Sequence, residues 1–147
     1  MSPWSRPARL GPVGEAMVAA ALAVVLLIPG SGRPPVIGQD EARFAQAARE
    51  MLARGELTVP TFAGEPRYDK PILIYWLVMA AYTGFGVGSG AARLPSALAA
   101  AALVALVAWR ARRHCPPGFG LLAAALLLAS PVFHVQGRAC TADMVML

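Results

Sequence analysis

Long apolar blocks alternate with short polar segments along this chain. Residues 11–29, 94–109 and 118–135 form three blocks dominated by Ala, Leu and Val. A helix needs about 20 apolar residues to cross a bilayer, with a tolerated range of about 17–25. Blocks of this kind are typical of membrane spans rather than of one large core. The pattern predicts an all-α, polytopic membrane protein with about three transmembrane helices.

The segment between the first two blocks, residues 30–93, is rich in Gly, Pro and charges of both signs. Within it, residues 41–54 have an apolar face at helical spacing, which predicts an amphipathic helix. Asp40 is expected to cap the start of this helix and Gly55 to end it. Such a helix can lie flat in the membrane interface. Residues 57–70 contain Pro and Gly and are predicted to form an irregular loop.

Residues 71–87 are apolar and aromatic, and their hydropathy alone is compatible with a further span. Basic residues in short loops favour the cytoplasmic side, which places residues 1–10 and 110–117 inside. An even number of crossings must then separate these two segments, and the blocks 11–29 and 94–109 already provide that number. We therefore predict that residues 71–87 form a re-entrant or interface-lying helix.

This topology makes residues 30–93 the first outer loop and residues 136–147 the start of the second. The composition agrees with a membrane protein, because 57% of the 147 residues are hydrophobic and only 14% are charged. The net charge is +5 and the mean hydropathy is +0.56. The basic residues are scattered or lie at the ends of apolar blocks, so a role in topology is favoured and a nucleic-acid partner is excluded.

Common soluble-enzyme motifs are absent from the sequence. There is no nucleotide-binding glycine loop and no Cys/His set with zinc spacing. Cys115 and Cys140 flank the block 118–135, so they are expected on opposite sides of the membrane and unpaired. One alternative is a cleaved signal peptide with a mature N-terminus near Gly32. Another is a non-catalytic small membrane protein or transporter fragment.

Charged residues near the apolar blocks are the candidates for chemistry, because ionisable groups near hydrocarbon are costly and usually face a cavity or one another. Structural roles are open for each of them. Asp40 is suited to capping a helix, Lys70 and Arg93 to snorkelling at the ends of spans, and Arg138 with Asp143 to a structural ion pair.

Several short motifs occur in an order that resembles one known family. They are Asp40-Glu41-Ala42-Arg43-Phe44, Ala48-Arg49-Glu50-Met51, Gly55-Glu56-Leu57-Thr58-Val59-Pro60, Tyr68-Asp69-Lys70-Pro71, Tyr75-Trp76, Arg93-Leu94-Pro95-Ser96, and Arg138 with Asp143. The ordered set, over residues 38–147, resembles the GT-C-fold lipid-linked-sugar glycosyltransferases of the aminoarabinose-transferase and protein O-mannosyltransferase family. One departure is Ile72, where the family often has a second proline.

The resemblance implies a glycosyltransferase of the bacterial inner membrane with its active site on the periplasmic side. Such an enzyme moves a sugar from a polyprenyl-phosphate carrier to a glycolipid, such as a lipid A-like molecule, or to a protein. The resemblance implies catalytic roles for Asp40, as general base, and for Glu41 beside it. It implies that Lys70 contacts the carrier phosphate.

The resemblance also implies a set of residues that line or brace the substrate site: Arg43, Tyr68, Arg93, Arg138 and Asp143. It implies that Asp69 helps to hold a divalent metal ion, and it implies no other cofactor. Family members are several times longer than this chain. The chain is therefore expected to be an N-terminal part of the enzyme, inactive alone.

Overall fold

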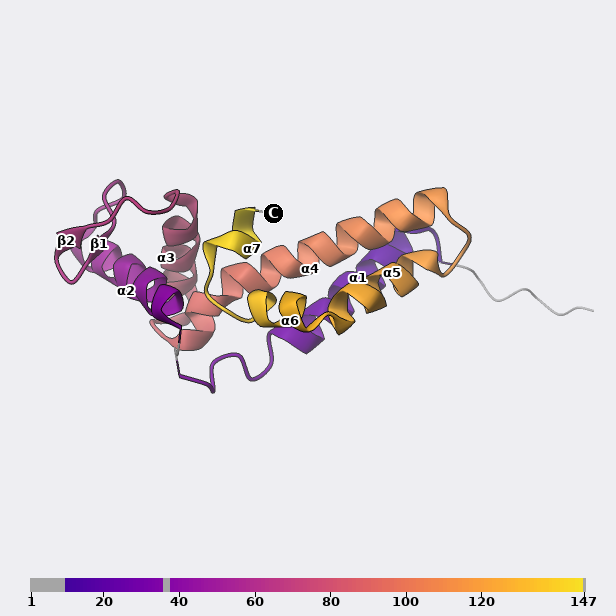
Figure 1. The fold of residues 1–147 in the computed structure, drawn as a ribbon, viewed down its shortest axis with the longest axis horizontal. Helices are drawn as coiled ribbons and strands as arrows, with labels where there is room; N and C mark the ends of the chain where they lie inside the picture. The colour runs from indigo at the N-terminus through magenta and orange to yellow at the C-terminus, as the bar shows by residue number, and fades with distance from the viewer. Residues whose placement is uncertain (1–9, 36–37, 147) are drawn as a thin grey trace, which may run out of the picture.

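The computed structural model describes residues 10–35 and 38–146, which are almost entirely helical (Figure 1). The predicted basic segment 1–10 therefore lies, except for its last residue, outside the described residues. The elements are α1 (Pro12–Leu27), α2 (Gln39–Arg54), β1 (Thr61–Phe62), β2 (Glu65–Pro66), α3 (Leu73–Phe85), α4 (Ser89–His114), α5 (Phe119–Ala129), α6 (Pro131–Gly137) and α7 (Ala142–Met146).

Helices α1, α4 and α5 form an elongated bundle (Figure 1). Ala19, Ala23 and Leu27 of α1 pack in one cluster with Ala100 and Val104 of α4, and small side chains of this kind let helix backbones approach closely. The 26 residues of α4 give it a length of about 39 Å at about 1.5 Å per residue. Within the described residues, α4 is the one helix long and apolar enough to cross a membrane, or one of two if α5 and α6 count as a single broken span.

The predicted transmembrane helix 118–135 is not one straight helix, because α5 and α6 meet at a bend of 78°. Pro131 causes the break. It lacks an N–H donor and disfavours the helical conformation at the preceding residue, and Ser130 is accordingly extended at φ −68° and ψ 119°. In contrast, the predicted helix 94–109 is longer than expected, since α4 begins at Ser89 and includes Pro95.

One end of the bundle is fastened by a buried carboxylate. Glu15 of α1 accepts hydrogen bonds from the backbone N–H groups of Gly118, at 2.9 Å, and Leu121, at 3.3 Å, at the start of α5. Its Oε1 lies 3.1 Å from Nε of Arg112 near the end of α4. A carboxylate at a helix N-terminus satisfies unpaired N–H groups and complements the helix dipole. Glu15 therefore joins the three bundle helices at this end.

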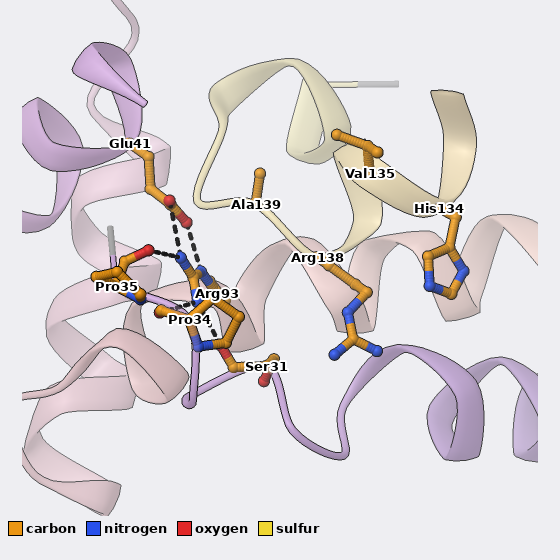
Figure 2. Close-up of a pocket in the computed structure, with 9 residues that line it drawn as sticks. All are labelled: Ser31, Pro34, Pro35, Glu41, Arg93, His134, Val135, Arg138 and Ala139. Carbon is orange, nitrogen blue, oxygen red and sulfur yellow. Dashed lines mark hydrogen bonds and ion pairs between the residues drawn. The ribbon is translucent and has the colours of Figure 1, made fainter. Parts of the chain in front are cut away.

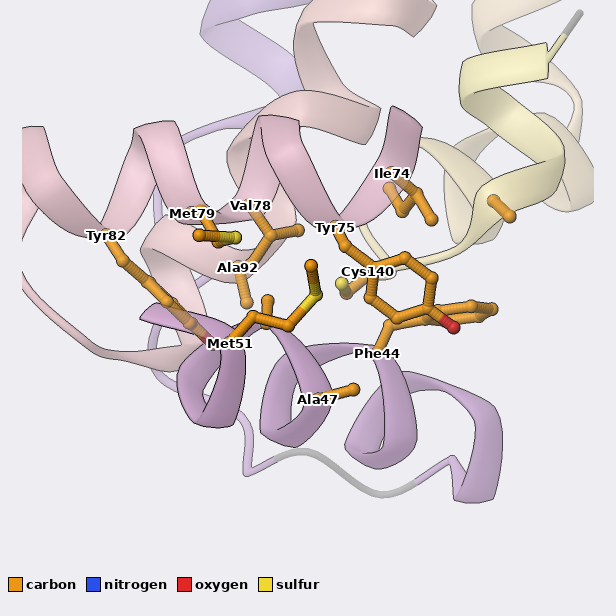
Figure 3. Close-up of a cluster of buried hydrophobic side chains, with 12 residues drawn as sticks. Phe44, Ala47, Met51, Ile74, Tyr75, Val78, Met79, Tyr82, Ala92 and Cys140 are labelled. Carbon is orange, nitrogen blue, oxygen red and sulfur yellow. The ribbon is translucent and has the colours of Figure 1, made fainter. Parts of the chain in front are cut away.

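Helices α2 and α3 pack together at the other end of the bundle (Figures 1 and 3). Phe44 and Met51 of α2 share a buried cluster with Tyr75 and Val78 of α3, and the rings of Phe44 and Tyr75 lie 5.7 Å apart. The apolar face of α2 is thus buried against α3, so it is not available to lie in a membrane interface. Gly55 ends α2 in the left-handed conformation, as predicted.

The expected N-cap of α2 is wrong. The helix begins at Gln39 with Gly38 as its N-cap, and no side chain makes a capping hydrogen bond there. Asp40 lies instead in the first turn, where its charge complements the helix dipole.

The predicted irregular loop 57–70 contains a small antiparallel hairpin, β1 and β2. Its two turn residues, Ala63 and Gly64, both have positive φ, at 54° and 83°, as a two-residue hairpin turn requires. Glu50 of α2 holds this hairpin by accepting hydrogen bonds from the Thr61 hydroxyl, at 2.7 Å, and the Ala63 N–H, at 3.0 Å. The hydroxyl is the main reason why the pKa of Glu50 is lowered.

Candidate active site

The candidate residues lie at the α2–α3 end of the bundle, where the chain from α6 to α7 passes close to α2 and α4 (Figures 1 and 2). The basic cluster of Arg110, Arg112 and Arg113 lies at the opposite end of α4. The structure therefore places the two groups at opposite ends of the bundle.

At the centre of this region Glu41 and Arg93 form a buried ion pair (Figure 2). Nε and Nη2 of Arg93 donate to the two carboxylate oxygens of Glu41 at 2.6 and 2.9 Å. Only 7% of Glu41 and 5% of Arg93 are exposed. The remaining guanidinium N–H groups donate to the backbone carbonyls of Ser31, Pro34 and Pro35. All five donors of Arg93 are thus used, and the side chain joins α2, α4 and the segment after α1.

Glu41 also holds the chain near its C-terminal end. Its Oε1 accepts a hydrogen bond of 2.9 Å from the backbone N–H of Cys140. Cys140 is fully buried, and burial together with the Glu41 carboxylate raises the pKa of its thiol to about 12. The thiol therefore stays neutral and unreactive. Both cysteines are free, as expected.

Asp40 differs from Glu41 in its surroundings. Its side chain is 73% exposed, and its Oδ1 lies 3.6 Å from Nη1 of Arg43. The two acids are successive residues of one helix, so they point in different directions. Glu41 shares the buried face of α2 with Phe44 and Ala48, whereas Asp40 faces outward. Of the pair, Asp40 is by far the more exposed carboxylate.

Lys70, the only lysine in the sequence, lies just before α3. Its Nζ donates to Oδ1 of Asp143 at 3.3 Å, and 42% of its side chain is exposed. The segment from Cys140 to Asp143 therefore contacts both Glu41 and Lys70. Through these contacts it links the start of α2 to the start of α3.

The structural ion pair considered for Arg138 and Asp143 does not form, because Asp143 pairs with Lys70. Arg138 instead donates to the backbone carbonyls of Leu26, at 2.9 Å, and Pro29, at 3.1 Å. These carbonyls lie at the end of α1, where backbone acceptors lack helical partners. Arg138 thus caps the C-terminal end of α1 and fixes the start of the segment that leads to α7, the helix that carries Asp143.

A divalent metal does not fit at Asp69. Its Oδ2 lies 3.1 Å from Nη2 of Arg67, and no group of three His, Cys, Asp or Glu side chains suitable for a metal occurs in residues 10–35 and 38–146. Hard cations prefer several oxygen ligands, and an arginine beside the carboxylate opposes them. The neighbouring Tyr68 is largely exposed.

Sequence reasoning missed two residues of this region. Arg67 packs over the ring of Phe44, 5.7 Å from its centroid, and pairs with Asp69. Cys140 supplies the backbone donor to Glu41. Neither residue belongs to a recognisable motif. The sequence around Cys140, which includes Arg138, Thr141 and Asp143, gives no signal for its burial.

A cavity of about 360 Å³ opens beside the Glu41–Arg93 pair (Figure 2). It is lined by Ser31, Pro34, Pro35, Glu41, Arg93, His134, Val135, Arg138 and Ala139. Asp40, Lys70 and Tyr68 do not line it. The candidate residues therefore fall into two groups, a buried group that joins segments together and an exposed group on α2 and before α3.

The comparisons with known proteins identify relatives over most of the chain. Residues 69–147 match the family model described as dolichyl-phosphate-mannose-protein mannosyltransferase. The undecaprenyl phosphate-alpha-4-amino-4-deoxy-L-arabinose arabinosyl transferase of Edwardsiella ictaluri is 42% identical over 74 residues, which are 50% of this chain and 13% of that protein. The protein of the same name from Yersinia pestis (strain Pestoides F) is 35% identical over 99 residues, which are 67% of this chain and 18% of that protein.

The fold has a counterpart among solved structures. ArnT from Cupriavidus metallidurans, in its crystal structure bound to undecaprenyl phosphate, aligns with a TM-score of 0.75 and 30% sequence identity. The alignment covers 91% of this chain and 25% of that one, and the apo structure of the same protein aligns equally well. The chain thus spans between about an eighth and a quarter of the length of these relatives. The matched family model, which covers more than half of the sequence, and the shared helical fold show that the chain belongs to the dolichyl-phosphate-mannose-protein mannosyltransferase family of glycosyltransferases.

Proposed function

We propose that this chain forms part of the active site of a glycosyltransferase that takes a sugar from a polyprenyl-phosphate carrier. The acceptor is a lipid A-like glycolipid or a protein, and transfer takes place on the outer face of the bacterial inner membrane. The observation that carries the proposal is the joint placement of Asp40 and Lys70. The exposed carboxylate of Asp40 and the exposed ammonium group of Lys70 are held at one end of the bundle. The segment 140–143 contacts Glu41, the neighbour of Asp40, and it also contacts the side chain of Lys70.

Lys70 is suited to the leaving group. Negative charge develops on the carrier phosphate as the bond to the sugar breaks, so a cation beside that phosphate stabilises the transition state more than the ground state. The partner of Lys70 is Asp143, whose side chain is 66% exposed. A phosphate can displace the ammonium group from this carboxylate at small cost, because exposed ion pairs are weak. Arg43 and Tyr68 supply further exposed donors near the two ends of this region.

Asp40 is suited to the acceptor. A general base must come within about 2.6–3.2 Å of the hydroxyl whose proton it takes, which requires an accessible carboxylate. Asp40 meets this requirement, because its side chain is 73% exposed beside Arg43. We assign Glu41, Arg93 and Arg138 to holding the segments that carry Asp40, Lys70 and Asp143, because their polar atoms are engaged within the protein.

Binding of the carrier is the first test. Undecaprenyl phosphate is titrated onto the chain in lipid nanodiscs, and bound lipid is measured by native mass spectrometry. Lys70→Ala is expected to weaken binding about tenfold or more, since a charge-assisted contact contributes about 1.5–3 kcal/mol. Arg49→Ala removes an exposed cation from α2 outside the proposed site and is expected to leave binding unchanged. Equal affinity in the two variants would remove Lys70 from the carrier site.

Transfer itself is tested in a chimera in which this chain replaces the matched quarter of the Cupriavidus protein. Asp40→Asn in the chimera is expected to abolish sugar transfer while leaving expression and undecaprenyl phosphate binding intact. If the parent chimera is active and the variant transfers sugar normally, Asp40 is not the base. If neither Asp40 nor Lys70 matters in either assay, the chain is instead a non-catalytic membrane component.

A further inference from the structure

The segment between α6 and α7 has no regular secondary structure, yet it leads directly to Asp143. Residues 138–141 lie outside the helices and strands, and α7 itself has five residues. Helices shorter than about 12–15 residues are marginal in isolation, so α7 cannot set its own position. The place of Asp143 therefore depends on the contacts that hold residues 140 and 141 against the rest of the protein.

Ser96 of α4 makes one of these contacts. Its hydroxyl donates to the carbonyl of Thr141 at 3.3 Å and accepts a hydrogen bond of 3.4 Å from the N–H of the same residue. A hydroxyl has one donor and two acceptor sites, so it can make both bonds at once. A serine inside a helix can instead bond the carbonyl four residues before it. Ser96 thus uses its side chain to hold another segment.

The hydroxyl lies in an enclosed position, because Ser96 is 0% exposed. Ala142 and Met144 of α7 are buried in clusters that also contain Ala92 and Ala97 of α4. Contacts between apolar groups are non-directional, so they hold α7 against α4 without fixing its exact position along the helix. The two bonds of Ser96 are directional and fix that position. Loss of these bonds would leave buried polar groups unsatisfied, which is costly.

Ser96 acts beside the buried ion pair described above. Arg93 and Ser96 are three residues apart, so they lie on one face of α4. Arg93 binds Glu41, which accepts a hydrogen bond from the N–H of Cys140, and Ser96 bonds the next residue, Thr141. The contact from Arg93 passes through a second side chain, whereas the contact from Ser96 is direct and lies one residue closer to α7.

The pair of Lys70 and Asp143 depends on this arrangement. Nζ of Lys70 lies 3.3 Å from Oδ1 of Asp143, and the two side chains are 42% and 66% exposed. An exposed ion pair is too weak to hold two segments in place by itself. Asp143 comes two residues after Thr141, so a shift of Thr141 moves the carboxylate relative to the ammonium group.

We propose that Ser96 is a positioning residue, which sets Asp143 beside Lys70 through Thr141 and thereby directs the ammonium group toward the carrier phosphate. The inference rests on the role proposed for Lys70 and adds a residue of α4 that acts on the site only through another segment. A displacement of about 1 Å at a reacting contact can lower a rate about 100-fold, so a buried hydroxyl away from the phosphate can affect the reaction.

The state of the ion pair can be read from Lys70 itself. It is the only lysine in the sequence, so the full chain labelled with lysine that carries ¹³C at Cε gives a single signal by NMR in lipid nanodiscs. Asp143→Asn defines how far this signal moves when the pair is lost. Ser96→Ala removes the hydroxyl and little volume, and it is expected to move the signal toward the Asp143→Asn position. The double variant is expected to match Asp143→Asn alone, because both changes act on one contact.

Thr141→Val is the matched control in the same segment. It removes the side-chain bond of Thr141 to Gln136, which is 3.3 Å long, and it keeps the backbone groups that bond Ser96. The Lys70 signal of this variant is expected to stay at the parent position. If Ser96→Ala lowers the helix content measured by circular dichroism, Ser96→Cys takes its place, because a thiol keeps the volume and bonds more weakly than a hydroxyl.

Three results would overturn the inference. A parent-like Lys70 signal in the Ser96 variant, with a shifted signal in Asp143→Asn, would leave the ion pair intact but independent of Ser96. Equal shifts in the Ser96 variant and in Thr141→Val would indicate general loosening of the segment. An unshifted signal in Asp143→Asn would show that no ion pair is present for Ser96 to position.

Turnover in the chimera with the Cupriavidus protein separates the inference from the proposed function. Ser96→Ala is expected to lower kcat about tenfold or more, and its combination with Asp143→Asn is expected to be no slower than Asp143→Asn alone. Effects that multiply would indicate a separate structural role and would overturn the inference. If the Lys70 signal responds as expected but Lys70→Ala leaves carrier binding unchanged, the proposed function fails although Ser96 still positions Asp143.

Discussion

Replacing Glu41 by Gln is expected to open the region around Cys140. The carboxylate of Glu41 accepts hydrogen bonds from Nε and Nη2 of Arg93 and from the backbone N–H of Cys140, at 2.6, 2.9 and 2.9 Å. A glutamine keeps the shape of the side chain. However, it removes the charge and turns an amide donor toward an arginine donor, which leaves the guanidinium buried without its anion.

The magnitude follows from the burial of the pair. Removing one partner of a buried ion pair costs about 3–5 kcal/mol, a large part of the about 5–15 kcal/mol that stabilises a typical domain. Because glutamine has the same shape as glutamate, we expect a cost at the lower end of this range, about 3 kcal/mol. At about 1.4 kcal/mol for each factor of ten, a loss of about 3 kcal/mol makes local opening about 100-fold more frequent.

Cys140 reports that opening directly. The variant is made in a Cys115→Ser background, which removes the exposed cysteine, and labelling by a maleimide reagent is followed by mass spectrometry. In the closed protein the thiol is buried with a pKa of about 12, so it reacts only when the region opens. The labelling rate is therefore expected to rise about 100-fold in the Glu41→Gln variant, in line with the cost of breaking a buried pair.

Two further variants separate the ion pair from general damage. Glu56→Gln changes an exposed carboxylate that bonds Thr58, and its labelling rate is expected to match the parent. Glu41→Leu combined with Arg93→Met removes both charges and is expected to label more slowly than Glu41→Gln, because no unpaired ion remains. A Glu41→Gln rate within about threefold of the parent would refute the reasoning, since that change amounts to less than about 1 kcal/mol.

Three other perturbations test the packing of the bundle and the hairpin. Glu15→Gln weakens the buried bond to the N–H of Gly118 and the pairing with Arg112, and is expected to lower stability by about 1–3 kcal/mol, measured by thermal unfolding in detergent with circular dichroism. Ala63→Asn places a residue that tolerates positive φ in the hairpin turn and is expected to raise stability by about 0.5–1 kcal/mol in the same assay; a decrease would contradict the turn assignment. The lowered pKa of Glu50 means that its contribution is fully present above its ordinary pKa of about 4.3 and is lost as the pH falls through the lowered value. Thr61→Val removes the main cause and is expected to reduce the acid dependence of unfolding below about pH 4.3, whereas an unchanged acid profile would exclude that hydroxyl as the cause.

Helices with a long and continuous apolar pattern could be predicted from the sequence. Residues 94–109 lie within α4, and the pattern over 41–54 corresponds to α2 with Gly55 at its end. The break at Ser130 was missed because a hydropathy average over the block does not register a single proline. The effect of Pro131 on the backbone of the preceding residue would have predicted the break. The start of a helix is harder to predict, because several neighbouring residues can serve as its N-cap. In α2 the N-cap is Gly38 and not Asp40.

In the candidate site, some features can be predicted from the sequence and others cannot. The motif around Asp40 and Glu41 does not by itself indicate which of the two acids is buried. Spacing contains that information, since Glu41 lies three residues before Phe44 and seven before Ala48 on the buried face. The pairing of Asp143 with Lys70, 73 residues away in sequence, had no local signal. Arg138 and Asp143 looked like partners because they are close in sequence, but α7 carries Asp143 toward α3 and leaves Arg138 at the end of α1.

Both ends of α1 are fastened by groups that are synthesised much later. The carboxylate of Glu15 accepts hydrogen bonds from the N–H groups of Gly118 and Leu121, which lie 103 and 106 positions further along the chain. The carbonyls of Leu26 and Pro29 accept hydrogen bonds from Arg138, which lies 112 and 109 positions further along. When α1 leaves the ribosome, its buried carboxylate and its last carbonyls have no native partners. They acquire them only when the final part of this chain has been made. Formation of α1 and the pairing of its two ends are therefore separate events during biosynthesis, and any nascent chain that stops before Arg138 carries an α1 whose C-terminal carbonyls still lack these partners.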